Sequence, residues 1–301
     1  MATTAETPDA FAVSNGLWNE CVLAYQVING PVRITLLGDQ SKSGPRGVLP
    51  NQWKGGFLRS VAWMHSITQL QSPSDFQAIF AAARALLEIT VDAVLLQHQN
   101  DAVAQMADWE NSAKLKHAEA ISRFYAGRQA PSNHQEAIAF AQREATAIAA
   151  RRIARGWVTS NGTRHPDRWT SRNLGDDARK ADGFEVGLDL EETYETKYRQ
   201  MCWYVHASGA VGLRSLGRDI FPTLGGLAFR ACSTLAEKHA KLMLRYSGAW
   251  DDPFDGQTWE SIFQGLRRLQ VLTIHSAAFG PDAYKRFLDS TDHSDDEGHS
   301  G

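Results

Sequence analysis

The chain has few cysteines, no long apolar run and no excess of positive charge. Its three cysteines, Cys21, Cys202 and Cys232, are widely spaced and form no Cys-x-x-Cys pair, so neither a disulfide framework nor a zinc knuckle is indicated. No uninterrupted apolar stretch approaches the length that crosses a bilayer. The formal net charge of −3 argues against a protein that coats nucleic acid non-specifically, since that mode depends on neutralising phosphates. A local basic site remains open.

Common enzyme signatures are also missing. The sequence contains no phosphate-binding loop, no dinucleotide-binding glycine turn, no nucleophile elbow and no His-Glu-x-x-His pair. The Glu-x-x-His pairs of helical di-iron proteins are absent as well. Residues 1–13 lack the basic start and apolar stretch of a secretory signal. We therefore expect a cytoplasmic protein with no metal, no cofactor and no membrane partner.

Helical patterns dominate what is present. Hydrophobic residues make up 43% of the chain and nine tryptophans add large packing surfaces. Apolar spacing and breakers predict helices over 16–28, 51–71, 75–98, 101–126, 133–155, 190–207, 224–246 and 257–279. A long polar loop is expected over 156–189. The prediction is an all-α fold, with one multi-helix, bundle-like domain over 16–289, a disordered N-terminus over 1–15 and an acidic disordered tail over 290–301.

The helix over 75–98 has the clearest pattern. Ser74 is expected as its N-cap, with Asp75 in the first turn and Gln77 at the capping-box position. Arg84 and Glu88 lie one turn apart beside its apolar stripe. They form either an exposed ion pair worth a few tenths of a kcal/mol or an inward-facing pair, where buried charge needs a partner or ligand.

The helix over 190–207 carries the most unusual polar set. Arg199 and His206 are separated by about 700° of helical rotation, within about 20° of two full turns, so they share a face. Tyr198 and Cys202 flank that face, and Ser208 follows it. A histidine can move a proton of an RNA 2′-hydroxyl or leaving group, and an arginine can hold the phosphate. The alternative is a solvated arginine and a helix-end histidine with structural roles only.

The loop before that helix is locally basic. Between Arg151 and Lys180 the sequence has eight Arg or Lys against three Asp. Cations alternate with an aromatic ring in the group Arg164, His165, Arg168, Trp169 and Arg172. This pattern is typical of a nucleic-acid-binding surface and equally of a solvated connection, because Asp167, Asp176 and Asp177 dilute its charge.

Three of these stretches occur together, and in this order, in a family of uncharacterised, mostly bacterial helical proteins that the chain resembles. The stretches are Arg84-Ala-Leu-Leu-Glu88, then Trp169-Thr-Ser-Arg-Asn-Leu-Gly, then Tyr198-Arg-Gln-Met-Cys202-Trp-Tyr-Val-His206-Ala-Ser208. The resemblance covers a core of about residues 55–250. Cys202 departs from it, because such relatives more often have serine there.

The Arg-x6-His spacing also resembles the motif of the HEPN superfamily, helical proteins that include metal-independent ribonucleases of toxin–antitoxin and phage-defence systems, usually dimeric. The resemblance implies a transition-state role for Arg199 and proton transfer for His206. It implies RNA as a partner, and either a homodimer or a protein partner. A second hypothesis stays open: a non-catalytic helical binding or interaction module, in which Arg84, Glu88 and His206 form a buried structural network.

Overall fold

We describe the protein from a computed structural model, which describes residues 51–70, 75–159, 162–163, 165–205, 220–247 and 264. The predicted helices over 16–28 and 257–279, both tails, Ser74, Arg164, His206 and Ser208 lie outside these ranges, apart from the single helical residue Gln264. Within them the fold is all-α, as predicted. The elements are α2 (Asn51–Thr68), α3 (Phe76–His98), α4 (Ala102–Phe124), α5 (Ser132–Ala154), β1 (Val158–Thr159), β2 (Gly162–Thr163), α6 (Leu174–Phe184), α7 (Leu190–Thr193), η2 (Tyr194–Tyr198), α8 (Arg199–Val205) and α10 (Ile220–Ser247).

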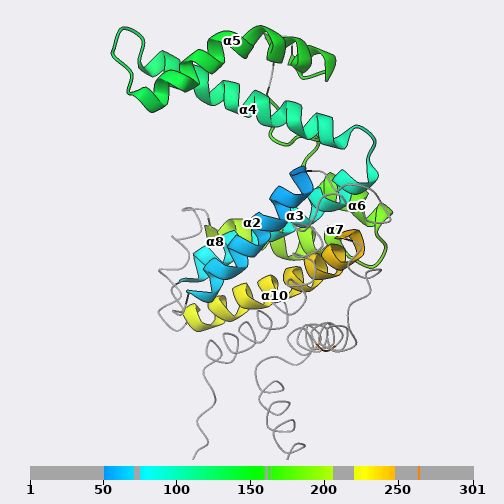
Figure 1. Cartoon of the computed structure of the whole chain (residues 1–301). Coiled ribbons are helices and arrows are strands. Elements are labelled where there is room, and N and C mark those ends of the chain that lie inside the picture. Colours follow the sequence, from blue (N-terminus) through cyan, green and yellow to red (C-terminus); the bar gives the residue numbers. More distant parts are fainter. Residues whose placement is uncertain are drawn as a thin grey trace, which may run out of the picture.

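Helix α3 is the centre of the body (Figure 1). It packs against α2, α6, α8 and α10, and most of its residues are buried. The apolar positions expected from its spacing, including Phe80, Leu87 and Val91, are 3% exposed or less. Every third or fourth residue of a helix lies on one face, and α3 also buries the residues between, because neighbours cover it on several sides. Its N-cap position is Asp75, with no side-chain capping bond.

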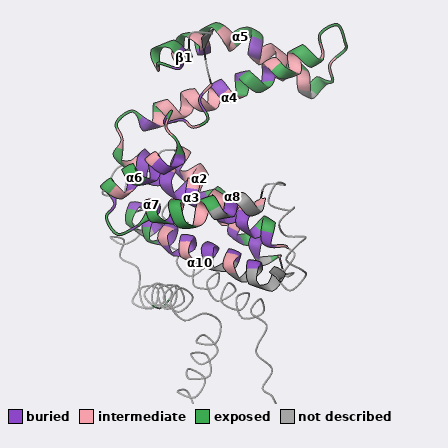
Figure 2. Ribbon diagram, turned by 180° about the vertical axis from the view of Figure 1, so that it is seen from behind, coloured by how far each residue is buried: buried purple, intermediate pink, exposed green. Residues whose placement is uncertain are grey.

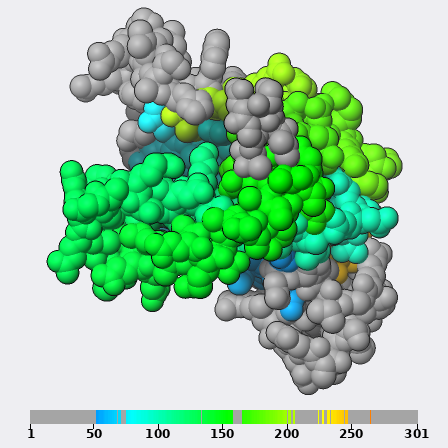
Figure 3. All heavy atoms as spheres, turned by 90° about the horizontal axis from the view of Figure 1, so that it is seen from above, coloured from blue at the N-terminus to red at the C-terminus, as the bar shows by residue number. Residues whose placement is uncertain are grey.

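Helices α4 and α5 form an arm that extends from the body (Figures 1 and 2). Their own apolar cluster is small: Leu115, Ala118, Ala141 and Ile148. At the base of the arm, Arg152 donates to Ser112 Oγ over 2.7 Å and to the Ser112 carbonyl over 3.0 Å. Gly156 follows α5 with φ +70°, the left-handed conformation that a glycine commonly adopts just after the end of a helix. Figure 3 shows the arm from above, spread across one side of the molecule.

The expected loop over 156–189 contains more structure than its composition indicates. Strands β1 and β2, of two residues each, pair in antiparallel orientation, and helix α6 follows them. The Asn173 side chain caps α6 by accepting from the Asp176 amide over 2.9 Å. Helix α6 has few large apolar residues, but its buried Leu174, Ala178 and Ala181 keep a helical spacing. With its capping residue and the acidic residues in its first turn, this spacing is the available signal.

The helix predicted over 190–207 is present over its described residues, up to Val205, with an unpredicted turn of π-helix at η2. A π-turn inserts one extra residue into the helical register and often marks a functional segment. No helix of the described ranges is both long and apolar enough to cross a membrane.

A polar cluster ties the far end of α3 to α10. Glu185 Oε1 accepts from Tyr246 Oη over 2.6 Å and lies 2.9 Å from His98 Nε2, while Arg245 pairs with Oε2. Burial opposes ionisation of Glu185, yet the bonds from Tyr246 and His98 and the charge of Arg245 lower its pKa overall. The cluster therefore fixes the end of the bundle.

Candidate functional site

The structure brings together the first and third stretches of the motif set, where α3 meets η2 and α8. Tyr198 Oη donates to Glu88 Oε1 over 2.8 Å and accepts from Arg84 Nη2 over 3.3 Å. The Arg84 guanidinium carbon also lies 5.1 Å from the Tyr198 ring centroid, within cation–π range. Arg84 and Glu88 therefore face inward onto Tyr198, and we call these three residues the α3–η2 cluster.

The α3–η2 cluster is half-buried, and this sets its protonation. Burial raises the pKa of Tyr198 to about 12, with the Arg84 hydrogen bond opposing. The phenol therefore keeps its proton and acts as the donor to Glu88. Arg84 Nε is buried without a partner among the described residues. Cys202 is a free, half-buried thiol whose electrostatic influence reaches Arg84.

Arg199 lies next to this cluster but faces solvent. Its side chain is 67% exposed, and within the described part of the chain it pairs with Glu195 at 3.3 Å, whose side chain is also exposed. The guanidinium carbon lies 5.9 Å from the Tyr194 ring centroid. Helix α8 is described up to Val205, so the predicted partner His206, and Ser208 after it, lie just beyond the described residues. Arg199 is accessible to an anionic ligand at little cost.

The second motif stretch has a different place. Arg168 pairs with two aspartates, Nη2 to Asp92 Oδ1 at 2.6 Å and Nε to Asp177 Oδ2 at 2.8 Å. Trp169 is 2% exposed and its indole nitrogen donates to Asp92 Oδ1 over 2.8 Å. The ring is therefore packed inside the body, where it cannot stack on a base. Arg172 Nε donates to Asp177 Oδ1 over 2.8 Å.

Asp177 is the anchor of this network, which sequence reasoning missed. Its side chain is fully buried and accepts from Arg168, Thr170 and Arg172. Asp92, on α3, supplies the second carboxylate. Burial raises the pKa of Asp92, with Arg168 and Trp169 opposing. Buried carboxylates need this degree of pairing. The arginines of the loop therefore hold the loop against α3.

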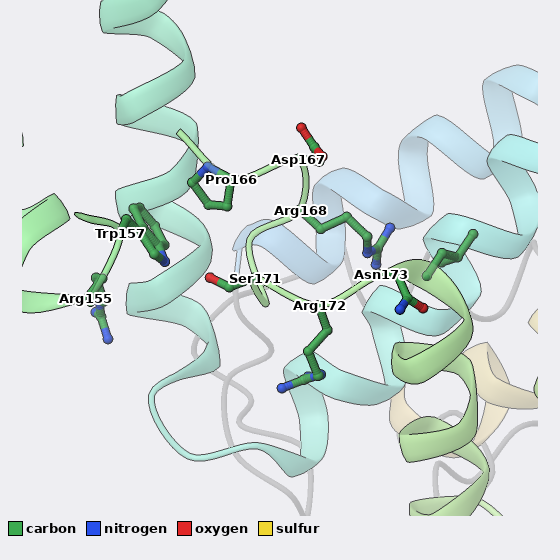
Figure 4. Close-up of a pocket in the computed structure, with 10 residues that line it drawn as sticks. Arg155, Trp157, Pro166, Asp167, Arg168, Ser171, Arg172 and Asn173 are labelled. Atoms are coloured by element: carbon green, nitrogen blue, oxygen red, sulfur yellow. The ribbon is translucent and has the colours of Figure 1, made fainter. Parts of the chain in front are cut away.

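A cleft of about 580 Å³ opens beside this network, between the end of α5 and the start of α6 (Figure 4). It is lined by Arg155, Gly156, Trp157, Pro166, Asp167, Arg168, Ser171, Arg172, Asn173 and Leu174. Figure 4 shows that the Arg168 guanidinium points away from the cleft and toward α3.

Two donors of this cleft have no acceptor among the described residues. They are Arg172 Nη2 and Trp157 Nε1, and the Trp157 ring is 4% exposed. An unsatisfied buried donor is costly, so the cleft suits a ligand that brings acceptor oxygens. Ser171 adds backbone strain, with φ +61°. Ser171 belongs to the second motif stretch, whereas Trp157 and Arg155 have no recognisable signal in the sequence.

His165, the remaining described member of the basic loop, binds the arm. Its Nδ1 lies 2.9 Å from Ser112 Oγ, and its ring lies 5.3 Å from that of Trp109. Burial, with help from Lys116 and Arg152, lowers the pKa of His165. Across the described residues, no three His, Cys, Asp or Glu side chains converge in a way that would hold a metal ion.

Comparison with known proteins gives one result. No curated protein and no solved structure matches the chain. A family of unknown function, DUF5677, matches residues 55–219, more than half of the 301 residues. The matched range begins in α2 and contains the α3–η2 cluster, the Asp177 network and the whole of α8. The expected resemblance to an uncharacterised helical family is confirmed in this form, and the chain belongs to the DUF5677 family of unknown function.

Proposed function

We propose that the protein acts on RNA, as a metal-independent endoribonuclease of the HEPN type in prokaryotic defence or a toxin–antitoxin pair. The observation that carries the proposal is the position of Arg199. It is exposed and weakly paired, yet it begins a helix whose preceding turn is fixed to α3 by Tyr198, Glu88 and Arg84. A catalytic arginine needs both access to phosphate and a rigid base.

The chemistry requires no metal. The 2′-oxygen of RNA attacks phosphorus while the bond to the 5′-oxygen breaks, which leaves a 2′,3′-cyclic phosphate and a 5′-hydroxyl. In the proposed mechanism His206 handles the proton that leaves the 2′-hydroxyl or the one that the 5′-oxygen gains. Arg199 stabilises the charge that develops on the phosphate oxygens. The seven-residue spacing of Arg199 and His206 in the sequence supports a shared helical face for the two residues.

The test is cleavage of a mixed RNA pool in excess chelator by the wild type, Arg199→Ala and His206→Ala. The matched control is Arg179→Ala, which removes another exposed arginine, 62% exposed and paired with Glu191 at 2.7 Å. The proposal predicts cyclic-phosphate ends from the wild type and the control, and none from the other two variants at unchanged helical content. Equal cleavage by Arg199→Ala and the wild type would refute it.

A second candidate, a non-catalytic binding module, is favoured by the cleft beside α6. Arg172 and Trp157 each bring an unpartnered donor to it, and no cleavage chemistry is needed to use them. Millimolar inorganic phosphate should then raise the thermal midpoint of the wild type but not of Arg172→Gln. Arg128→Gln, on the arm, is the control. A phosphate-independent midpoint in the wild type would count against this candidate.

A further inference from the structure

A smaller cavity, of about 240 Å³, lies where α2, α3, α4 and α10 meet. Its apolar lining includes Trp53, Phe57, Ile89 and Leu96, each 7% exposed or less. An engineered apolar cavity of about 150 Å³ is large enough to bind benzene. The present cavity therefore has room for one substituted aromatic ring.

Two polar atoms of the residues that line this cavity are buried with no hydrogen-bond partner in the part of the chain that the structure describes. They are Nε1 of Trp53 and Nε2 of His239, on side chains that are 2% and 1% exposed. An unsatisfied buried polar group costs about 1–3 kcal/mol, and native proteins satisfy nearly all such groups. Trp53 and His239 both line the cavity, so a ligand bound there would lie beside them.

The hydrogen bonds around His239 define which partner it needs. Thr90 Oγ1 uses its single proton to donate to the Leu86 carbonyl over 2.7 Å. Thr90 Oγ1 also lies 3.4 Å from His239 Nδ1. Because the hydroxyl proton is already used, the oxygen must accept in this contact, and the imidazole proton is therefore on Nδ1. Burial lowers the pKa of His239 to about 4, and the ring is neutral at pH 7. Nε2 is thus a bare acceptor, and Trp53 Nε1 is a donor.

The helix next to the cavity leaves its space open. Gly55 and Gly56 both line it from the interior of α2, where a glycine costs about 0.5–1 kcal/mol relative to alanine. A Cβ on Gly56 would meet Ile89 Cγ2 at 3.5 Å, whereas a Cβ on Gly55 would meet nothing within 4 Å. Packing therefore does not require a glycine at 55, but an open cavity does.

The charges around the cavity balance. Its charged lining residues are Arg59, Asp92 and Glu110, and Asp92 is already paired with Arg168 and bonded by Trp169. The remaining arginine and glutamate have opposite signs. A ligand of this cavity therefore needs no net charge.

We propose that the cavity binds a small, neutral, planar amide built on one aromatic or heteroaromatic ring. The amide oxygen accepts from Trp53 Nε1, the amide N–H donates to His239 Nε2, and the ring packs on Phe57, Ile89 and Leu96. The site is independent of the proposed RNA chemistry at Arg199 and adds a small-molecule binding function to the body.

The probe is benzamide, titrated into the full chain, with two relatives as controls: benzoate, which lacks the N–H donor and is charged, and toluene, which lacks both polar groups. Binding is followed by the thermal midpoint and by the indole ¹H–¹⁵N signal of Trp53, identified by its loss in Trp53→Phe. Gly55→Leu fills the cavity without touching either polar atom. Gly183→Leu is its matched control, since a Cβ there also meets nothing within 4 Å and lies in α6.

The expected result is saturable benzamide binding that raises the midpoint and shifts the Trp53 indole signal, with at least tenfold weaker binding of both relatives. Gly183→Leu should bind like the wild type, and Gly55→Leu should lose binding while keeping its helical content. Absence of benzamide binding to the wild type, or equal binding by Gly55→Leu, would overturn the proposal. So would an unshifted Trp53 signal at saturation.

Discussion

Two arginines that the sequence singles out, Arg168 of the basic loop and Arg199 of α8, lie in opposite environments. Arg168 is 15% exposed and bonded to two aspartates, whereas Arg199 is 67% exposed with one exposed glutamate at 3.3 Å. Breaking a buried pair leaves an uncompensated charge, while exposed pairs contribute little. Within the described residues, the arginines of the basic loop therefore hold the fold, whereas α8 presents an exposed arginine. Four substitutions test this difference.

The largest effect is expected for Asp177→Ala. The change leaves Arg168 and Arg172 without their shared carboxylate and removes the acceptor of Thr170. Removing one partner of a buried pair costs about 3–5 kcal/mol, measured as the free energy of unfolding in urea. Asp176→Ala is the neighbouring control, because its side chain is 45% exposed, and a much smaller loss is expected. Equal losses would show that Asp177 is no anchor.

The next largest effect on the free energy of unfolding is expected from the buried His239, and it depends on pH. The unfolded chain binds this proton at about pH 6.5, but the folded chain binds it only near pH 4. The unfolded state therefore holds more protons between these values, and the free energy of unfolding falls as the pH is lowered through this window. The full difference is about 3 kcal/mol. Urea unfolding at several pH values should show this loss in the wild type and a flatter profile in His239→Leu; parallel profiles would contradict it.

A moderate effect is expected for Tyr198→Phe in the α3–η2 cluster. The change removes the donor to Glu88 and the acceptor for Arg84, and hydrogen bonds to charged groups contribute about 1.5–3 kcal/mol. Tyr194→Phe is the control, since its ring stacks on that of Tyr198 and the substitution keeps the stack. A loss confined to Tyr198→Phe in chemical denaturation would confirm the cluster; similar curves for both variants would not.

The smallest effect on stability is expected for Arg199→Ala. Its exposed contact with Glu195 should change the free energy of unfolding by no more than about 0.5 kcal/mol. Thermal and urea unfolding should both give wild-type midpoints. A loss as large as that of Tyr198→Phe would mean that Arg199 holds the fold.

The apolar periodicity of the sequence predicts the larger helices well. Helix α3 begins and ends within a residue or so of its expected range, since its buried positions follow a strong 3.6-residue spacing. Helix α6 is not predicted because the polar, glycine-containing composition of residues 156–189 favours a loop, although the buried Leu174, Ala178 and Ala181 keep a helical spacing. The π-turn of η2 is not predicted either, because the apolar spacing of the sequence carries no signature of it.

The candidate site is predicted only in part, for a physical reason. Sequence spacing places Arg84 and Glu88 one turn apart, and it leaves open whether they face solvent or Tyr198, over a hundred residues later. Asp177 was interpreted as diluting a basic surface, whereas it is the buried charge that the surface residues neutralise. Charge composition counts residues but does not say which of them pair.

The most direct test of the contrast measures stability and RNA cleavage together in Arg168→Leu and Arg199→Ala, with chelator present. The account predicts that Arg168→Leu lowers the free energy of unfolding by several kcal/mol, of the order expected for a broken buried pair. Arg199→Ala should keep wild-type stability and lose cleavage. An Arg199→Ala protein that cleaves RNA at the wild-type rate would contradict the account.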